Sequence, residues 1–319
     1  HDEADRQLVL DLYRASGKPI ELGLLAPTPN APMAWQRTIE FAREAAAQGA
    51  RVHPQFATQK LGLHLRLCDT FVFDELPTWR RVLTLPEPER CRQLRDPSVR
   101  ERMRAEYADE TTRNIAFELG QLVVESVRDE SHRALVGRLV PELARERGVS
   151  DLDALLDVSL AEDLHTAFEV ASTAQAREFM DFVTRQTVAE PLVMAGSSDG
   201  GAHLASFVGA DYTTKLLTDW VPEVLSLEQA VWRLAGMPAA VHGLRDRGVI
   251  RVGAKADLNV IDPSRLAAGE HYVARDFPAG TERYVVGATG YAATVVNGVV
   301  LMEDGKHTGA LPGEVIRGA

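Results

Sequence analysis

The alternation of apolar and polar positions predicts that helices and strands follow each other in the first part of the chain. Apolar residues recur at helical spacing over residues 2–16 and again over residues 35–48. The run PIELGLL at 19–25 reads as a strand, and RVHPQF at 51–56 reads as a short extended segment. Strands that alternate with helices over connections of this length form a parallel sheet.

A further buried strand is predicted at 192–196, where the run Leu192–Ala195 leads directly into the sequence AGSSDGGAHL. Between the second and third strands, residues 89 to 190 are rich in charge and read as helices with solvated faces. A complete eight-stranded α/β barrel needs about 250 residues. Three convincing strands are found and about a hundred residues are an insertion. Either further strands escape the pattern, or the chain is the C-terminal part of a larger barrel, which we expect.

The last quarter of the chain changes character. Ser226 with Gln229 predicts a capped helix over 226–234, and Met237-Pro238 predicts its break. From Gly248 onward, short β-prone runs alternate with glycine-rich turns, and Asn297-Gly298 predicts a type I′ hairpin. These residues indicate a small β domain that is distinct from the α/β body.

Composition narrows the class of partner. The formal net charge of −11 argues against nucleic acid and anionic membranes, because both require a basic face. Two cysteines make no disulfide framework and are expected to be free thiols. No apolar run is long enough to span a membrane, and the opening HDEADRQ does not resemble a signal peptide, so we expect a cytoplasmic protein.

Four motifs together resemble the C-terminal part of the amidohydrolase superfamily, in particular its N-acyl-D-amino-acid deacylase (D-aminoacylase) branch. A weaker match is Leu94–Pro97 with Arg100. The four motifs are SDGGAH at 198–203, MPAA with GLRDRG at 237–248, VGAKADLNVIDP at 252–263, and VVNGV with GKHTG and PGEVIR at 295–317.

The resemblance implies an α/β fold, a metal-dependent (β/α)₈ TIM barrel with a small β-sandwich domain. We therefore predict that residues 1–245 are the C-terminal part of the barrel, with a helical insertion at about 87–190, and that residues 246–319 are the small β domain. In this family the β domain combines both ends of the chain, so the strand in the third motif is expected to present an exposed edge.

The resemblance also implies a zinc-dependent hydrolase with one or two ions, acting on a non-peptide C–N amide bond of a small molecule. Zinc polarises the carbonyl and lowers the pKa of its bound water to about 7. By resemblance, Asp199 is a metal ligand and the general base, and His1 stands where a strand-five histidine ligand is expected. Without the resemblance, Asp199 reads as a turn aspartate and His1 as a chain end.

Three further polar residues are candidates for substrate binding: His53 and Gln55 at the end of a predicted strand, and His203, four residues after Asp199. Each is equally readable as a structural polar residue. The chain departs from the family pattern, because no HxH occurs, the strand at 19–25 offers only Glu21, and Leu204–Ser206 stands where the family often has an arginine. His64 is read as structural.

Two alternatives stay open from the sequence. The protein is a non-catalytic or incomplete member of the fold, or it hydrolyses a cyclic amide or an ester at the same site. The sequence does not decide whether the chain forms a homo-oligomer.

Overall fold

The computed structural model describes residues 3–25, 31–56, 58, 62–109, 113, 117–196, 198 and 204–316. The chain forms two compact units. Unit 1 comprises His1–Leu61, Gln175–Ala202 and Val208–Ala319, and unit 2 comprises Gly62–Ala174 and His203–Phe207.

Unit 1 contains a parallel sheet made from the three strands that the sequence predicts. Its order is β1-β2-β6, with β1 at Ile20–Leu24, β2 at Val52–Phe56 and β6 at Met194–Ala195. β2 pairs in parallel with both neighbours. The prediction of a parallel sheet is therefore confirmed, and β2 is its central strand.

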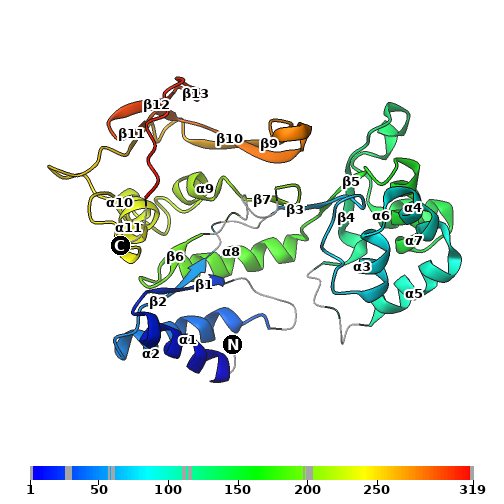
Figure 1. Cartoon of the computed structure of the whole chain (residues 1–319), viewed down its shortest axis with the longest axis horizontal. Helices are drawn as coiled ribbons and strands as arrows, with labels where there is room; N and C mark the ends of the chain where they lie inside the picture. Colours follow the sequence, from blue (N-terminus) through cyan, green and yellow to red (C-terminus); the bar gives the residue numbers. More distant parts are fainter. Residues whose placement is uncertain are drawn as a thin grey trace. The chain divides into compact units, whose positions relative to one another are not determined.

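Helices cover one face of this sheet. α1 (Glu3–Ser16) and α2 (Ala34–Ala47) lie on the same side of β1 and β2 in Figure 1. Two apolar clusters fill the space between sheet and helices, because the apolar stripe of α2 faces the strands. The buried side chains that α2 contributes are Trp35, Ile39, Phe41, Ala42 and Ala45. The remaining helices before the capped segment are α8 (Ala174–Val188) and α9 (Tyr212–Asp219).

The capped helix begins as predicted but does not break at proline. Ser226 and Gln229 form the capping box of α10 (Leu227–Val231). A π-helical turn, η3 (Trp232–Gly236), then leads into α11 (Met237–Val241) without interruption. The predicted break is wrong, because proline in the first turn of a helix lacks an N–H that would have no intrahelical partner there.

The C-terminal residues of unit 1 are β-structured. One sheet has the order β13-β12-β11-β8 and a second pairs β10 with β9. The hairpin prediction is confirmed, because Asn297 (φ 48°) and Gly298 (φ 79°) join β11 to β12. β8 lies at an edge of its sheet, as the resemblance implied. The elements are β8 (Leu258–Ile261), β9 (Ala267–Ala274), η4 (Pro278–Gly280), β10 (Arg283–Thr289), β11 (Tyr291–Val296), β12 (Val299–Glu303) and β13 (Lys306–His307).

Unit 2 is mixed rather than wholly helical. Its four-stranded sheet has the order β4-β5-β3-β7, and two of these strands lie in the segment that the sequence analysis reads as helices. The strands are β3 (Gly62–Leu65), β4 (Leu122–Ser126), β5 (Ala167–Val170) and β7 (Phe207–Val208). The helices are α3 (Pro77–Leu83), α4 (Glu87–Arg95), α5 (Pro97–Ala108), η1 (Leu119–Gln121), η2 (Glu130–Leu135), α6 (Val140–Arg147) and α7 (Asp151–Ala161).

Unit 2 has its own apolar core between this sheet and its helices. Trp79 is fully buried there, stacks on Phe73 with ring centroids 4.2 Å apart, and donates its indole N–H to the Met103 carbonyl. An aromatic pair with its polar atom satisfied is a stable centre for a core of this size.

Candidate functional site

The sheet of unit 1 carries several polar side chains on the face opposite the α2 core. Along β2, Val52, Pro54 and Phe56 are buried, whereas His53 and Gln55 are half-buried and point to the opposite side. On the adjacent strand β1, Glu21 is in register with His53. The strand alternation therefore places three polar side chains on the face that does not carry the helix-packing core.

His53 is the second residue of β2 and therefore lies near the N-terminal ends of the parallel strands. Its Nδ1 is 3.2 Å from the Leu192 carbonyl oxygen, just before β6 begins. Because a carbonyl only accepts hydrogen bonds, His53 Nδ1 is the donor in this contact. The contact holds the imidazole near the N-terminal end of β2.

Gln55 lies one residue pair further toward the C-terminal ends, in register with Met194 of β6. Its Nε2 donates to Glu21 Oε2 at 2.5 Å. The other carboxylate oxygen of Glu21 is 3.0 Å from His242 Nε2, directly after α11. Glu21, Gln55 and His242 therefore form one connected polar cluster on the sheet face.

Gly196 directly follows β6 and lies beside Gln55 of this cluster. Its N–H donates to the Phe56 carbonyl at 3.2 Å, so β2 holds the end of β6. A Cβ built on Gly196 would lie 3.4 Å from both Cδ and Oε1 of Gln55. The glycine lets the Gln55 amide lie against the backbone just before the sequence reaches Ser198 and Asp199.

The structure does not test all of the predicted site residues. His1, Asp199 and His203 lie outside the described residues. His53 and Gln55 are described and lie on the same face of β2. His53 is nearer the N-terminal end of the strand and contacts Leu192, whereas Gln55 is nearer the C-terminal end and contacts Glu21. The roles assigned to all five residues therefore stay predictions.

Metal-ligating side chains do not converge among the described residues of unit 1: no group of three His, Cys or carboxylate residues brings its ligand atoms together there. In unit 2, His64 is buried with its Nδ1 2.8 Å from Glu125 Oε2.

The sequence analysis misses the role of His242. Its side chain is 54% exposed, and nothing in the sequence around it selects it as a site residue. Its contact with Glu21 joins two segments that are more than 200 residues apart in the sequence. No local sequence pattern predicts such a contact. The sequence does offer one indication of this contact. Glu21 is a carboxylate in an otherwise apolar strand, and a partly buried carboxylate requires a polar partner.

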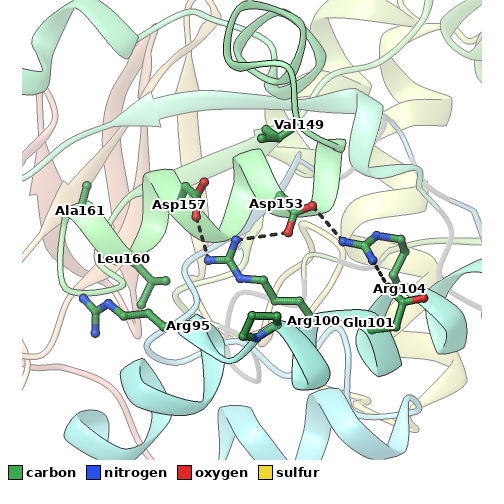
Figure 2. A pocket seen from close by; sticks show the side chains of 10 residues that line it. Arg95, Arg100, Glu101, Arg104, Val149, Asp153, Asp157, Leu160 and Ala161 are labelled. Carbon is green, nitrogen blue, oxygen red and sulfur yellow. Dashed lines mark hydrogen bonds and ion pairs between the residues drawn. The ribbon is translucent and has the colours of Figure 1, made fainter.

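An open depression on unit 2 is lined by ion pairs (Figure 2). Arg100 of α5 binds Asp153 at 3.2 Å and Asp157 at 2.7 Å, both on α7. Arg104 binds the second oxygen of Asp153 at 2.8 Å. These charges neutralise one another across the two helices, so the arrangement is a brace between α5 and α7 rather than a ligand site. It also explains the Arg100 motif without invoking catalysis.

Replacing Arg100 with alanine is expected to destabilise unit 2 by about 1–2 kcal/mol, because it leaves Asp157 and part of Asp153 without a partner in a partly buried setting. Arg95 is the matched control, since it lines the same depression (Figure 2) and its contact is one long bond to the Cys91 carbonyl. We expect Arg95→Ala to change stability by less than about 0.5 kcal/mol. Native-state hydrogen exchange of α5 and α7 measures both, and equal effects would contradict the brace.

A family comparison decides where this chain belongs. The sequence model of the amidohydrolase family matches residues 88–302, about two thirds of the chain. The chain belongs to the amidohydrolase family. The predicted resemblance is therefore confirmed, and the matched range includes β6, the stretch after it and most of the β-structured C-terminal segment.

Curated relatives match parts of the chain. An uncharacterized protein of Mycobacterium tuberculosis is 34% identical over 179 residues, which are 51% of this chain and 29% of that protein. The D-aminoacylase of Alcaligenes xylosoxydans xylosoxydans is 37% identical over 90 residues, 28% of this chain and 17% of the enzyme. The match thus covers less than a third of these curated relatives.

Solved structures of this amidohydrolase branch share the fold. A D-aminoacylase mutant in complex with CuCl₂ aligns over 97% of this chain and 52% of its own, with a TM-score of 0.57 and 20% identity. N-acyl-D-glutamate deacylase from Bordetella bronchiseptica, complexed with zinc and a phosphonate inhibitor, aligns over 99% of this chain and 53% of its own, with a TM-score of 0.54 and 21% identity. The chain spans about half the length of these structures, and the predicted α/β amidohydrolase fold is confirmed.

Within the described ranges, no helix combines the length and the apolar character that crossing a membrane requires.

Proposed function

We propose that this amidohydrolase-family chain is part of a metal-dependent hydrolase that cleaves a non-peptide C–N amide bond in a small molecule, in the manner of N-acyl-D-amino-acid deacylases. The observation that carries the proposal is the family match over residues 88–302, which includes the strand β6 and the aspartate that follows it. The D-aminoacylase and N-acyl-D-aspartate deacylase among the relatives support the amide class.

The proposed roles follow the sequence prediction. Asp199 is a metal ligand and takes the proton from the attacking water, and His1 is a second ligand. A bound zinc ion would polarise the amide carbonyl and lower the pKa of its water to about 7. A carboxylate that accepts the water's proton can later protonate the departing nitrogen, which an amide requires because its amine is a poor leaving group.

Gln55 and His203 are the proposed substrate contacts. Gln55 is half-buried at the level of β6, beside the backbone that leads to Asp199. His203 follows Asp199 by four residues. His53 is the weaker candidate, because its bond to the Leu192 carbonyl places it nearer the N-terminal ends of the strands, whereas chemistry in α/β barrels takes place at the C-terminal ends.

A non-catalytic role is the second candidate, and one observation favours it. The 319 residues contain no HxH, and β1 carries Glu21 where the family has a histidine ligand. A protein of this type would retain the fold and lack a working metal site. A cyclic-amide or ester hydrolase would use the same residues and differ only in substrate.

The proposal is tested with the full gene product, loaded with zinc and assayed on N-acyl-D-amino acids, their L-enantiomers, cyclic amides and esters. We expect hydrolysis of at least one amide, its loss on treatment with a chelator, and its return when zinc is added back. Stoichiometric zinc without turnover of any substrate would favour the non-catalytic role. Turnover that a chelator does not affect would contradict metal dependence.

A further inference from the structure

We propose that unit 2 binds a zinc ion between the Cys68 thiol and the His165 imidazole, with the Asp69 carboxylate as a third ligand. Cys68 follows β3, and His165 lies between α7 and β5, so a shared ion joins two segments that are 97 residues apart in the sequence. All three residues belong to unit 2. None of them has a role in the proposed hydrolysis, so this site goes beyond that function.

The separation of sulfur and nitrogen is the first observation. Cys68 Sγ lies 3.7 Å from His165 Nδ1. Zinc binds a thiolate sulfur at about 2.3 Å and an imidazole nitrogen at about 2.0–2.1 Å, in tetrahedral geometry. Two such ligands of one ion therefore lie about 3.6 Å apart. The sulfur and the nitrogen are already spaced as neighbouring corners of a zinc tetrahedron, and little movement is needed to take up an ion.

Asp69 brings a negative charge and an oxygen ligand to the same sulfur. Its side chain is hydrogen-bonded to the Cys68 thiol. Its Oδ2 also accepts from Arg66 at 2.7 Å, and the Asp69 side chain is 45% exposed. Exposed ion pairs contribute little to stability, so the carboxylate can turn toward an ion at small cost. Thiolate, imidazole and carboxylate are the three ligand types that zinc binds in proteins.

The backbone holds the two main ligands opposite each other. The Cys68 N–H donates to the Leu164 carbonyl at 3.2 Å, directly before His165. Leu164 is fully buried and has a φ of 67°, and Asp163 before it has a φ of 51°. Two successive left-handed residues other than glycine are unfavourable, so packing and hydrogen bonds have to hold this turn. The imidazole is thereby kept in place before an ion binds.

An ion would change the state of the Cys68 thiol. Burial, and after it the negative charge of Asp69, raises the pKa of this thiol to about 12, so it keeps its proton at neutral pH. When zinc binds, the S–H bond breaks, the Zn–S bond forms and the proton passes to water. The Asp69 charge, which opposes a thiolate on its own, then faces a cation and favours the complex. Cys68 and His165 are both partly exposed, so an ion can reach them.

The second cysteine of the chain provides a matched control. Cys91 on α4 is also a free and partly exposed thiol of unit 2, and its pKa is raised by burial as well. Among the described residues, no histidine or carboxylate side chain is hydrogen-bonded to its sulfur. The two thiols therefore differ in the neighbouring ligands that a zinc site requires.

The experiment titrates the metal-free full gene product with cadmium and follows the ultraviolet charge-transfer band that cadmium–thiolate bonds produce. We expect Cys91→Ser to give the same band as the parent, and Cys68→Ser to give a band that is smaller by one thiolate per chain. His165→Gln should weaken cadmium binding at Cys68 by about tenfold or more, because even the loss of a residue that only supports a metal ligand costs about 10–100-fold. Excess zinc should displace the cadmium from Cys68.

A second measurement needs no substitution and so does not depend on whether a variant folds. Zinc should slow the alkylation of Cys68 in the parent and leave that of Cys91 unchanged, as measured by mass spectrometry of the two peptides. Protection of both cysteines or of neither would overturn the proposal.

The titration has its own contrary outcomes. Equal bands in Cys68→Ser and the parent would show that Cys68 binds no ion. Cadmium binding that depends on Cys68 but is unchanged in His165→Gln would reduce the site to a single thiol and overturn the pair. Cadmium that excess zinc does not displace would contradict the assignment to zinc. None of these measurements requires turnover, so they test this site independently of the proposed function.

Discussion

Asp199→Asn is expected to lower kcat/KM for amide hydrolysis by about a thousandfold or more and to leave the fold intact. Asparagine has nearly the same shape, but it has no negative charge to hold a metal ion and accepts no proton from water at neutral pH. The measurement is steady-state turnover on the best amide substrate together with the zinc content of each preparation. In the proposed mechanism both roles belong to one carboxylate, so turnover should fall even where zinc is supplied in excess.

The matched control is Asp181→Asn, which makes the same chemical change at an exposed position on α8. It should keep parental turnover and zinc content. Circular dichroism of Asp199→Asn should overlay that of the parent. Unchanged turnover in Asp199→Asn would remove this residue from the mechanism, and a loss of zinc with full turnover after reloading would limit its role to metal affinity.

The sheet of unit 1 could be predicted because its strands are short extended segments, two of them mostly apolar, that alternate with segments of clear helical periodicity. The runs at 19–25, 51–56 and 192–196 became β1, β2 and β6. Strands buried in a parallel sheet carry this signal in the local sequence itself. The hairpin at Asn297-Gly298 was predictable for the same reason, since both residues adopt the positive φ that the turn requires.

The strands of unit 2 were missed because their signal is not local. LVVES at 122–126 stands between charged helical segments, and its alternating burial is apparent only from its pairing with β5. That partner is separated from β4 by η2, α6 and α7. β propensity depends on what a strand packs against, so the isolated sequence favoured the helices on either side.

The polar cluster of unit 1 was predictable in part. Gln55 was selected from its place at a strand end, and Glu21 was noted as the one polar group that β1 offers. His242 could not be selected, because its contact with Glu21 depends on how α11 returns to the sheet. The orientation of the Gln55 amide depends on its contact with Glu21, which His242 also contacts.

Glu162→Ala is expected to destabilise unit 2 by about 3 kcal/mol, the largest stability effect that we predict. The side chain of Glu162 is fully buried at the end of α7 and accepts hydrogen bonds from His132 Nδ1 and from the backbone N–H groups of Arg128 and Asp129. These hydrogen bonds connect the turn at Arg128 and Asp129, which precedes η2, to the C-terminal end of α7. Removing the carboxylate leaves two backbone donors and an imidazole without their acceptor, and each buried unsatisfied group costs about 1–3 kcal/mol.

The same carboxylate gives the prediction a pH dependence. Burial alone would raise the pKa of Glu162, but the hydrogen bonds from His132 and the two backbone N–H groups outweigh it and lower this pKa below its usual value. A lowered folded-state pKa means that the unfolded chain binds the proton more tightly. The contribution of Glu162 is therefore fully present above the unfolded pKa, about 4.3, and is lost as the pH falls through the folded value.

Glu162→Gln separates the charge from the shape. It fills the same space but offers one acceptor oxygen in place of two, so its stability at pH 7 should fall between those of the parent and Glu162→Ala. Native-state hydrogen exchange of peptides from unit 2 at pH 7 and at about pH 4 measures both effects. The parent should lose part of its advantage over Glu162→Gln at the lower pH. An advantage that is equal at both pH values would show that the buried carboxylate does not stabilise unit 2 through its charge.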